Sequence, residues 1–161
     1  MRMRLKFIDD YNRIKHIPGA IESVADSAAH SLMLEALNDM RKNVKKNKSM
    51  AFSRLLNSID APQKLGHAHY RGGPSAKHGF YVEHGRSPGK APPQKAIRDW
   101  MRVKGIRLPE KQMQQVAFLI GRKIAKKGTK PRPFVAPVAR QKQWRDDYAR
   151  LVANGIDRRL A

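Results

Sequence analysis

The stretch Gly128-Thr-Lys-Pro-Arg-Pro-Phe-Val-Ala-Pro-Val138 decides how the last two helices of this chain meet. Pro131 and Pro133 fix φ and remove backbone donors, so they hold this connector extended. Gly128 stands where a left-handed cap would end the preceding helix. Phe134 is the one large apolar side chain between the cations Lys130 and Arg132 on one side and the next helix on the other. We therefore expect a stiff, basic connector whose aromatic residue docks against the core or against a neighbouring subunit.

Helical patterns flank this connector on both sides. Pro109 opens a helix that ends at Gly128, and Pro137 starts a C-terminal helix, because proline is harmless in a first helical turn. In both segments apolar residues recur at three- and four-residue steps, which predicts one buried face on each helix. These residues are Met113, Val116, Ala117, Ile120 and Ile124 in the first, and Trp144, Tyr148, Leu151, Val152 and Ile156 in the second.

The rest of the chain predicts an α+β fold. Apolar spacing indicates a long helix over 20–46 and a short helix over 94–104. Residues 63–85 carry most of the strand-like character, and within them 79–84 fits a strand or a short helical turn equally well. Residues 1–17 are expected to form an N-terminal arm or strand. We predict a single domain over residues 1–161, with a long N-terminal helix, a small central antiparallel sheet, two further helices and a C-terminal helix.

Composition limits the classes of function. The 161 residues carry a formal net charge of +21, which predicts attraction to polyanions or to acidic protein surfaces. The absence of cysteine excludes disulfides and thiolate sites, and it fits assembly in a reducing cytoplasm. No apolar run approaches the roughly 20 residues of a membrane span, and no signal peptide is indicated.

Candidate catalytic residues are confined to a group of histidines. His67, His69, His78 and His84 lie close in sequence, with Glu83 beside the last. Such a group could bind zinc or serve a nuclease, but no metal-binding motif and no set of carboxylates accompanies it. No nucleophile motif or phosphate-binding loop occurs either. We therefore predict that the protein is not an enzyme and binds no metal or cofactor.

Two basic clusters are candidate contacts for DNA or an acidic partner. One spans residues 41–48, near the end of the long helix, and the other spans residues 122–132. No recognition helix stands out, so phosphate contact without base reading is the better hypothesis. The candidates are Lys42, Lys45, Lys46, Lys126, Lys127, Lys130 and Arg132. Phe134, Trp144 and Tyr148 are the candidates for contact with a subunit or neighbour.

The order of these features resembles the tail-completion, or head–tail joining, family of long-tailed double-stranded DNA bacteriophages. Four segments carry the resemblance, and it covers about residues 20–155. The long N-terminal helix is followed by Ser53-Arg-Leu-Leu-Asn-Ser-Ile59, then by Tyr81-Val-Glu-His-Gly85. A Pro-Pro…Ile-x-x-Trp…Lys-Gly helix spans 92–105, and the block from Ala117 to Phe134 is the most specific part.

The resemblance implies a structural protein of the virion neck or tail end. It implies a homo-oligomeric ring, six-fold at a tail-tube end, that completes the tail or joins it to the head around the DNA path. Its expected partners are the tail-tube protein, the head-completion or connector proteins, and genomic double-stranded DNA through nonspecific contact. Its expected location is the virion, after assembly in the host cytoplasm. Two alternatives stay open: a sequence-nonspecific DNA-binding protein, and a small metal-dependent nuclease that uses the cluster from His67 to His84.

Overall fold

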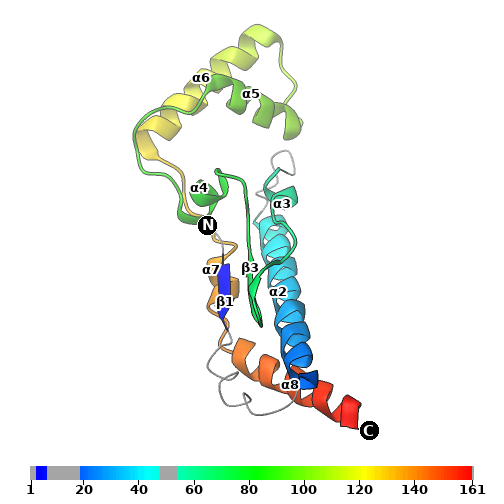
Figure 1. Ribbon diagram of the computed structural model, residues 1–161. Helices are drawn as coiled ribbons and strands as arrows, with labels where there is room; N and C mark the ends of the chain where they lie inside the picture. The colour runs from blue at the N-terminus through cyan, green and yellow to red at the C-terminus, as the bar shows by residue number, and fades with distance from the viewer. Residues whose placement is uncertain (1–2, 7–18, 48–53, 161) are drawn as a thin grey trace.

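The computed structural model describes residues 3–6, 19–47 and 54–160, and Figure 1 shows their arrangement. The fold is α+β and mostly helical, as predicted. Its elements are β1 (Met3–Lys6), α2 (Ala20–Lys46), α3 (Arg54–Asn57), β2 (Gln63–Gly66), β3 (His69–Gly72), α4 (Gly79–His84), α5 (Gln94–Val103), α6 (Glu110–Lys127), α7 (Ala136–Ala139) and α8 (Trp144–Leu160).

Helix α2 is the spine of the molecule, and its predicted limits are confirmed. Glu22 lies in its first turn and Lys45 and Lys46 in its last, a polarity that complements the helix dipole. Its apolar residues recur at the expected spacing and form one wall of the core. The buried ones are Val24, Ala25, Ala28, Ala29, Leu32, Met33, Ala36, Leu37, Met40 and Val44.

The antiparallel sheet lies against α2, with the strand order β1-β3-β2. The central strand β3 buries Tyr70 and Gly72 toward the helix. A Cβ at Gly72 would lie 2.8 Å from a methyl carbon of Leu37, so glycine permits this close approach. The small central sheet is therefore confirmed, whereas residues 79–84, which the sequence left open, form helix α4.

The C-terminal helix differs from its prediction. The sequence predicted one helix from Pro137, but the chain turns after α7 and α8 begins only at Trp144. The indole Nε1 of Trp144 donates a hydrogen bond of 2.8 Å to the carbonyl oxygen of Val138, which stabilises this corner. Helix α8 then packs along α2, where a Cβ at Gly155 would overlap the side chain of Val24.

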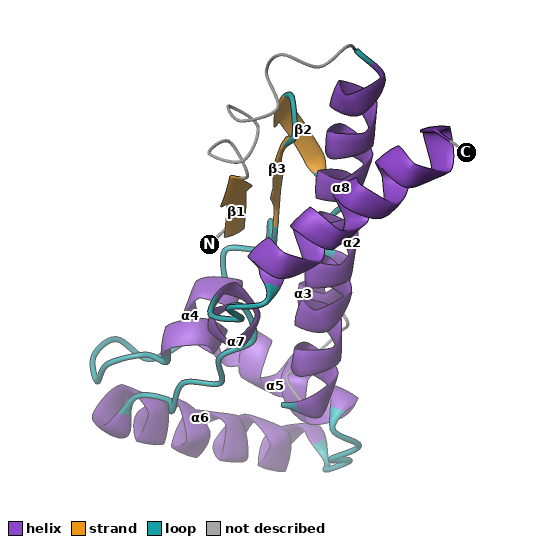
Figure 2. Cartoon of the chain, turned by 90° about the horizontal axis from the view of Figure 1, so that it is seen from below, coloured by secondary structure: helices purple, strands orange, loops and turns teal. Residues whose placement is uncertain are grey.

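Two separate apolar clusters hold the described chain together. The larger one joins α2, α3, β3, the end of the connector, α7 and α8. The smaller one lies between α5 and α6 and contains Ile97, Met101, Met113 and Ala117. In Figures 1 and 2 the α5–α6 hairpin occupies one end of the molecule, away from α8. Among the described residues, no helix is long and apolar enough to cross a membrane.

Candidate interaction surfaces

A buried carboxylate fixes the connector that joins α6 to α7. Glu83 is only 3% exposed and belongs to α4. One of its oxygens accepts hydrogen bonds from the backbone N–H groups of Phe134 and Val135, at 2.7 and 2.9 Å. The other accepts from the N–H of Ala136 at 2.8 Å. Three backbone N–H groups at the start of α7 therefore donate to one carboxylate. A negative charge at a helix N-terminus is stabilised by such N–H groups and by the helix dipole.

A second clasp closes the base of the hairpin. The backbones of Arg86 and Thr129 exchange two hydrogen bonds, of 3.1 and 2.8 Å. Gly85 and Gly128 flank this pair with positive φ, and a Cβ on either would collide with the facing backbone. The second and fourth family-like segments thus lie against each other, and their glycines are required by this close approach.

The connector is also tied to the end of α2. The side-chain amides of Asn43 and Asn47 donate hydrogen bonds to the carbonyl oxygens of Phe134 and Pro133, at 3.3 and 2.9 Å. In return, the guanidinium of Arg132 donates to the carbonyl oxygen of Asn47 at 3.2 Å. The connector is therefore docked within the chain, as one of the two sequence hypotheses proposed.

The three predicted neighbour contacts are core residues in this structure. Phe134, Trp144 and Tyr148 are 0%, 5% and 1% exposed, and all three belong to the larger apolar cluster. This burial is internal, because a single chain produces it. It accounts for their apolar character, and the assignment of these residues to a contact with a subunit or neighbour stays a prediction.

The basic residues predicted to contact DNA or an acidic partner are all exposed. One group lies at the end of α2, and the other lies at the end of α6 and the start of the connector. Lys42, Lys45 and Lys46 lie on the last turns of α2, where Lys42 pairs with Asp39 at 2.8 Å. Arg132 reaches this end of α2 through Asn47. The other three lie farther back along the chain, at the end of α6 and on the connector: Lys126, Lys127 and Lys130.

The four histidines between positions 67 and 84 do not gather into a metal site in the described chain. Within residues 3–6, 19–47 and 54–160, no group of three histidine, cysteine, aspartate or glutamate residues could hold an ion. His67 precedes β3 and His69 begins it, whereas His78 and His84 flank and end α4. Glu83, which the sequence placed beside this group, is occupied by backbone N–H groups instead. The nuclease hypothesis is thus left without a described ligand set.

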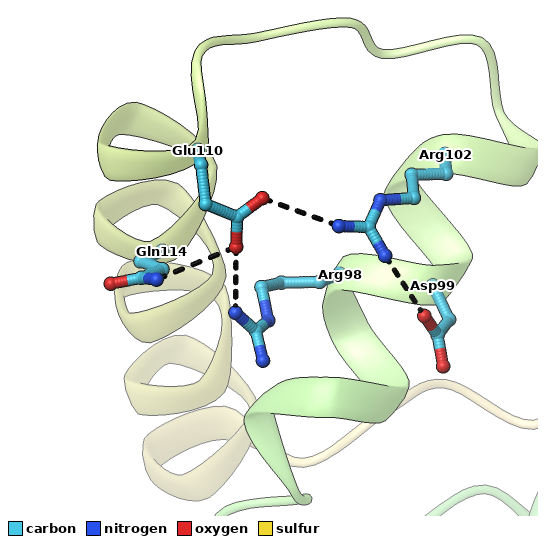
Figure 3. Close-up of polar contacts among 5 residues, drawn as sticks. All are labelled: Arg98, Asp99, Arg102, Glu110 and Gln114. Atoms are coloured by element: carbon cyan, nitrogen blue, oxygen red, sulfur yellow. Dashed lines mark hydrogen bonds and ion pairs between the residues drawn. The ribbon is translucent and has the colours of Figure 1, made fainter.

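A network of ion pairs links the two helices of the hairpin on one side, as Figure 3 shows. Glu110 accepts hydrogen bonds from Arg98 and Arg102, at 2.8 and 3.2 Å. Arg102 also pairs with Asp99 at 3.4 Å, and Gln114 donates to Glu110 at 3.4 Å. The hydrogen bond from Gln114, with a smaller contribution from Arg98 and Arg102, lowers the pKa of Glu110 below its usual value. Exposed pairs of this kind stabilise only weakly, but they mark which side of the hairpin is polar.

The hairpin also exposes large apolar side chains. Trp100 of α5 is 36% exposed, although the neighbouring Ile97 and Met101 are buried. Its neighbour Val103 is 46% exposed. The spacing of apolar residues did not distinguish the buried from the exposed side chains of the hairpin, because so small a core covers only part of each helix. The exposed set on the hairpin is Trp100, Val103, Leu108, Phe118 and Leu119.

Helix α4 carries a second exposed apolar group, made of aromatic rings. Phe80 and Tyr81 are 52% and 54% exposed, and their rings meet edge to face at 5.8 Å between centroids. The ring of His84 lies 4.8 Å from that of Phe80, and the guanidinium of Arg86 lies 5.9 Å from the centre of the Tyr81 ring. Clustered aromatics beside a cation are typical of protein interfaces.

A polar network ties the sheet to α2 at Asp26. Its carboxylate accepts hydrogen bonds from the Lys64 ammonium at 2.6 Å, the Tyr70 hydroxyl at 2.8 Å and the backbone N–H of Ala68 at 3.0 Å. Although burial raises the pKa of Asp26, the hydrogen bonds from Lys64, Tyr70 and Ala68 outweigh it and hold this pKa below its usual range. The network anchors the sheet and has no feature of a catalytic site.

Comparison of the chain with family models, with curated proteins and with solved structures finds no match.

Proposed function

We propose that this chain is a structural protein of a bacteriophage neck or tail end, which forms a ring and contacts the proteins on either side of it. The observation that carries this proposal is the projecting α5–α6 hairpin, whose large apolar side chains face solvent. Several large apolar side chains exposed on one hairpin of a folded chain are typical of a surface that another protein covers. The sequence resemblance described above supplies the kind of assembly.

A ring subunit needs several different surfaces. Cyclic rings close through head-to-tail contacts, so each copy presents two unlike faces to its neighbours, and further faces to the proteins above and below. The exposed rings of α4 and the apolar residues of the hairpin are two such surfaces on different elements. The rigid clasp at Glu83 and Arg86 supports the proposal, because it holds the two surfaces in a fixed relation.

The exposed cations favour a second candidate, a sequence-nonspecific DNA-binding protein. Lys126, Lys127, Lys130 and Arg132 line the end of α6 and the connector without a base-reading element. Contact with phosphates through such residues would give a log–log salt slope of about −0.9 per neutralised phosphate. The same residues would serve a neck ring through which DNA passes, so DNA binding alone does not separate the two candidates.

Assembly and location separate them. Native mass measurement and electron microscopy of the full chain should give closed rings, with six-fold symmetry as the first expectation. Antibody labelling or mass spectrometry of purified virions should find the chain in the particle. A chain that stays monomeric, binds duplex DNA tightly and is absent from virions would overturn the proposal in favour of the second candidate.

A further inference from the structure

We propose that one side of the α5–α6 hairpin binds an acidic protein surface with an apolar centre. We call this side the apolar side and define it by Trp100 and Val103 of α5 and Val116 and Ile120 of α6. The inference deepens the proposed function and rests on it, because it names the chemistry of a partner that a neck protein would have.

The spacing of residues places these four side chains together. Trp100 and Val103 are three apart and Val116 and Ile120 four apart, so each pair shares one face of its helix. Trp100 is two residues from Arg98 and from Arg102, which project to nearly the opposite side of α5. The same holds in α6 for Val116 and Gln114. The ion-pair network of Figure 3 therefore lies on one side of the hairpin, and the apolar side lies on the other.

The apolar side is continuous with the small core beneath it. Val116 and Ile120 pack partly against the buried cluster of the hairpin, whereas Trp100 and Val103 stay 36% and 46% exposed. An apolar centre that merges with a rigid, buried layer is the usual anatomy of a protein interface. A DNA backbone would leave these groups in contact with charged phosphates, since protein–DNA interfaces are polar and strongly cationic.

Charge complementarity identifies the partner. Residues 94–128 hold ten lysines and arginines but only two acidic residues. Both of these, Asp99 and Glu110, pair with arginines of the hairpin itself. Lys104 and Lys123 lie next in sequence to, or one helical turn from, members of the apolar side. A second copy of so basic a hairpin would be repelled, whereas an acidic rim would be attracted.

The test uses the full chain and a synthetic amphipathic helix, with leucines on one face and glutamates on the others. Binding is followed by tryptophan fluorescence, because Trp100 is exposed while Trp144 is already buried. Three matched ligands serve as controls: the same helix with lysines for glutamates, a scrambled peptide of identical composition, and a short DNA duplex. We expect saturable binding and a blue shift with the leucine–glutamate helix alone, weakening as salt screens the charges.

Two acidic substitutions on the hairpin locate the contact. Val103→Glu places a carboxylate on the apolar side and should weaken binding by about tenfold or more, since it removes an apolar contact and adds repulsion. Gln115→Glu adds the same charge at an exposed position of α6 outside that side, and binding should stay within about twofold. Far-ultraviolet circular dichroism and thermal melting should be unchanged in both, because each replaced side chain is exposed.

Several results would overturn the inference. If the scrambled peptide binds equally well, the interaction depends on charge alone. If both variants lose the same affinity, the contact does not lie on the apolar side. If the chain forms a homo-oligomer that Val103→Glu dissociates, the apolar side binds a second copy of the chain. If DNA shifts the fluorescence of Trp100 and Val103→Glu abolishes that shift, the apolar side binds DNA. Failure of the proposed function is distinguishable: a chain that binds the acidic helix but never enters virions refutes only the neck proposal. A chain that forms a ring in the virion but does not bind the acidic helix refutes only this inference.

Discussion

Replacing Glu83 by glutamine should destabilise the fold far more than a single neutral-for-charged substitution normally does. The carboxylate accepts three backbone N–H groups at 2.7–2.9 Å, and it is 3% exposed. A glutamine keeps one acceptor oxygen and puts an NH₂ group where the other was. At best the oxygen retains the bonds to Phe134 and Val135, and the NH₂ group then faces the N–H of Ala136.

The magnitude follows from these contacts. One donor loses its partner, which costs about 1–3 kcal/mol. Two hydrogen bonds lose their charge assistance, and this roughly halves each of them, or about 1 kcal/mol apiece. Because such terms are not fully additive, we expect a loss of about 2–4 kcal/mol in the free energy of unfolding. Glu83→Ala leaves three donors without a partner and should cost about 4 kcal/mol or more.

Urea unfolding at neutral pH, followed by fluorescence and circular dichroism, measures these differences. Glu35→Gln is the matched control, because Glu35 is exposed on α2 and its change should stay within about 0.5 kcal/mol. A Glu83→Gln protein as stable as the control would refute the reasoning. It would mean that the start of α7 is held by apolar packing and not by the carboxylate.

Three further substitutions test the clasp, the core and the polar network. Phe134→Ala should cost about 3–5 kcal/mol in urea unfolding, because the ring is fully buried; an unchanged monomer with impaired ring assembly would instead place it at an interface. Gly128→Ala should destabilise clearly more than Gly105→Ala: both glycines have positive φ, but only at Gly128 would the Cβ overlap the carbonyl oxygen of Arg86. Gly105→Ala should cost about 1 kcal/mol, and equal melting temperatures for the two variants would contradict the close approach. The pKa of Asp26 is lower in the folded chain than in the unfolded one, so its contribution is present above its unfolded value near 3.8 and is lost as the pH falls through the folded value. Asp26→Asn should therefore unfold with a weaker pH dependence below about pH 5, and an unchanged dependence would exclude this role.

Local signals explain which parts of the fold could be predicted from the sequence. Helix α2 was predicted to its last residue, because its apolar spacing runs unbroken and its charges follow the dipole. The prolines and glycines around α5 and α6 likewise gave their limits to within a residue. The break between α7 and α8 was missed, because it depends on the hydrogen bond from Trp144 to Val138, which forms only in the folded chain.

The candidate surfaces were harder to predict than the fold, because they depend on contacts between distant segments. Glu83 lies about fifty positions before the three residues whose N–H groups donate to it, so no local sequence pattern indicates its role. Its signal was indirect: an acidic residue two positions before Gly85, in a chain with few carboxylates. The aromatic Phe134 was assigned to a partner for the same reason, since the sequence does not show that α2 and α8 already enclose it.

The distribution of carboxylates sharpens the meaning of the net charge. The chain has thirteen acidic residues, and at least six of them are engaged within the fold by hydrogen bonds or ion pairs. These six are Asp26, Asp39, Glu83, Asp99, Glu110 and Asp147. Glu83 is buried against backbone N–H groups, whereas each of the other five neutralises a neighbouring lysine or arginine. The positive charge of the surface therefore comes from the lysines and arginines that outnumber these carboxylates. On the hairpin this leaves cations around an exposed apolar centre, which an acidic protein can neutralise and cover at the same time.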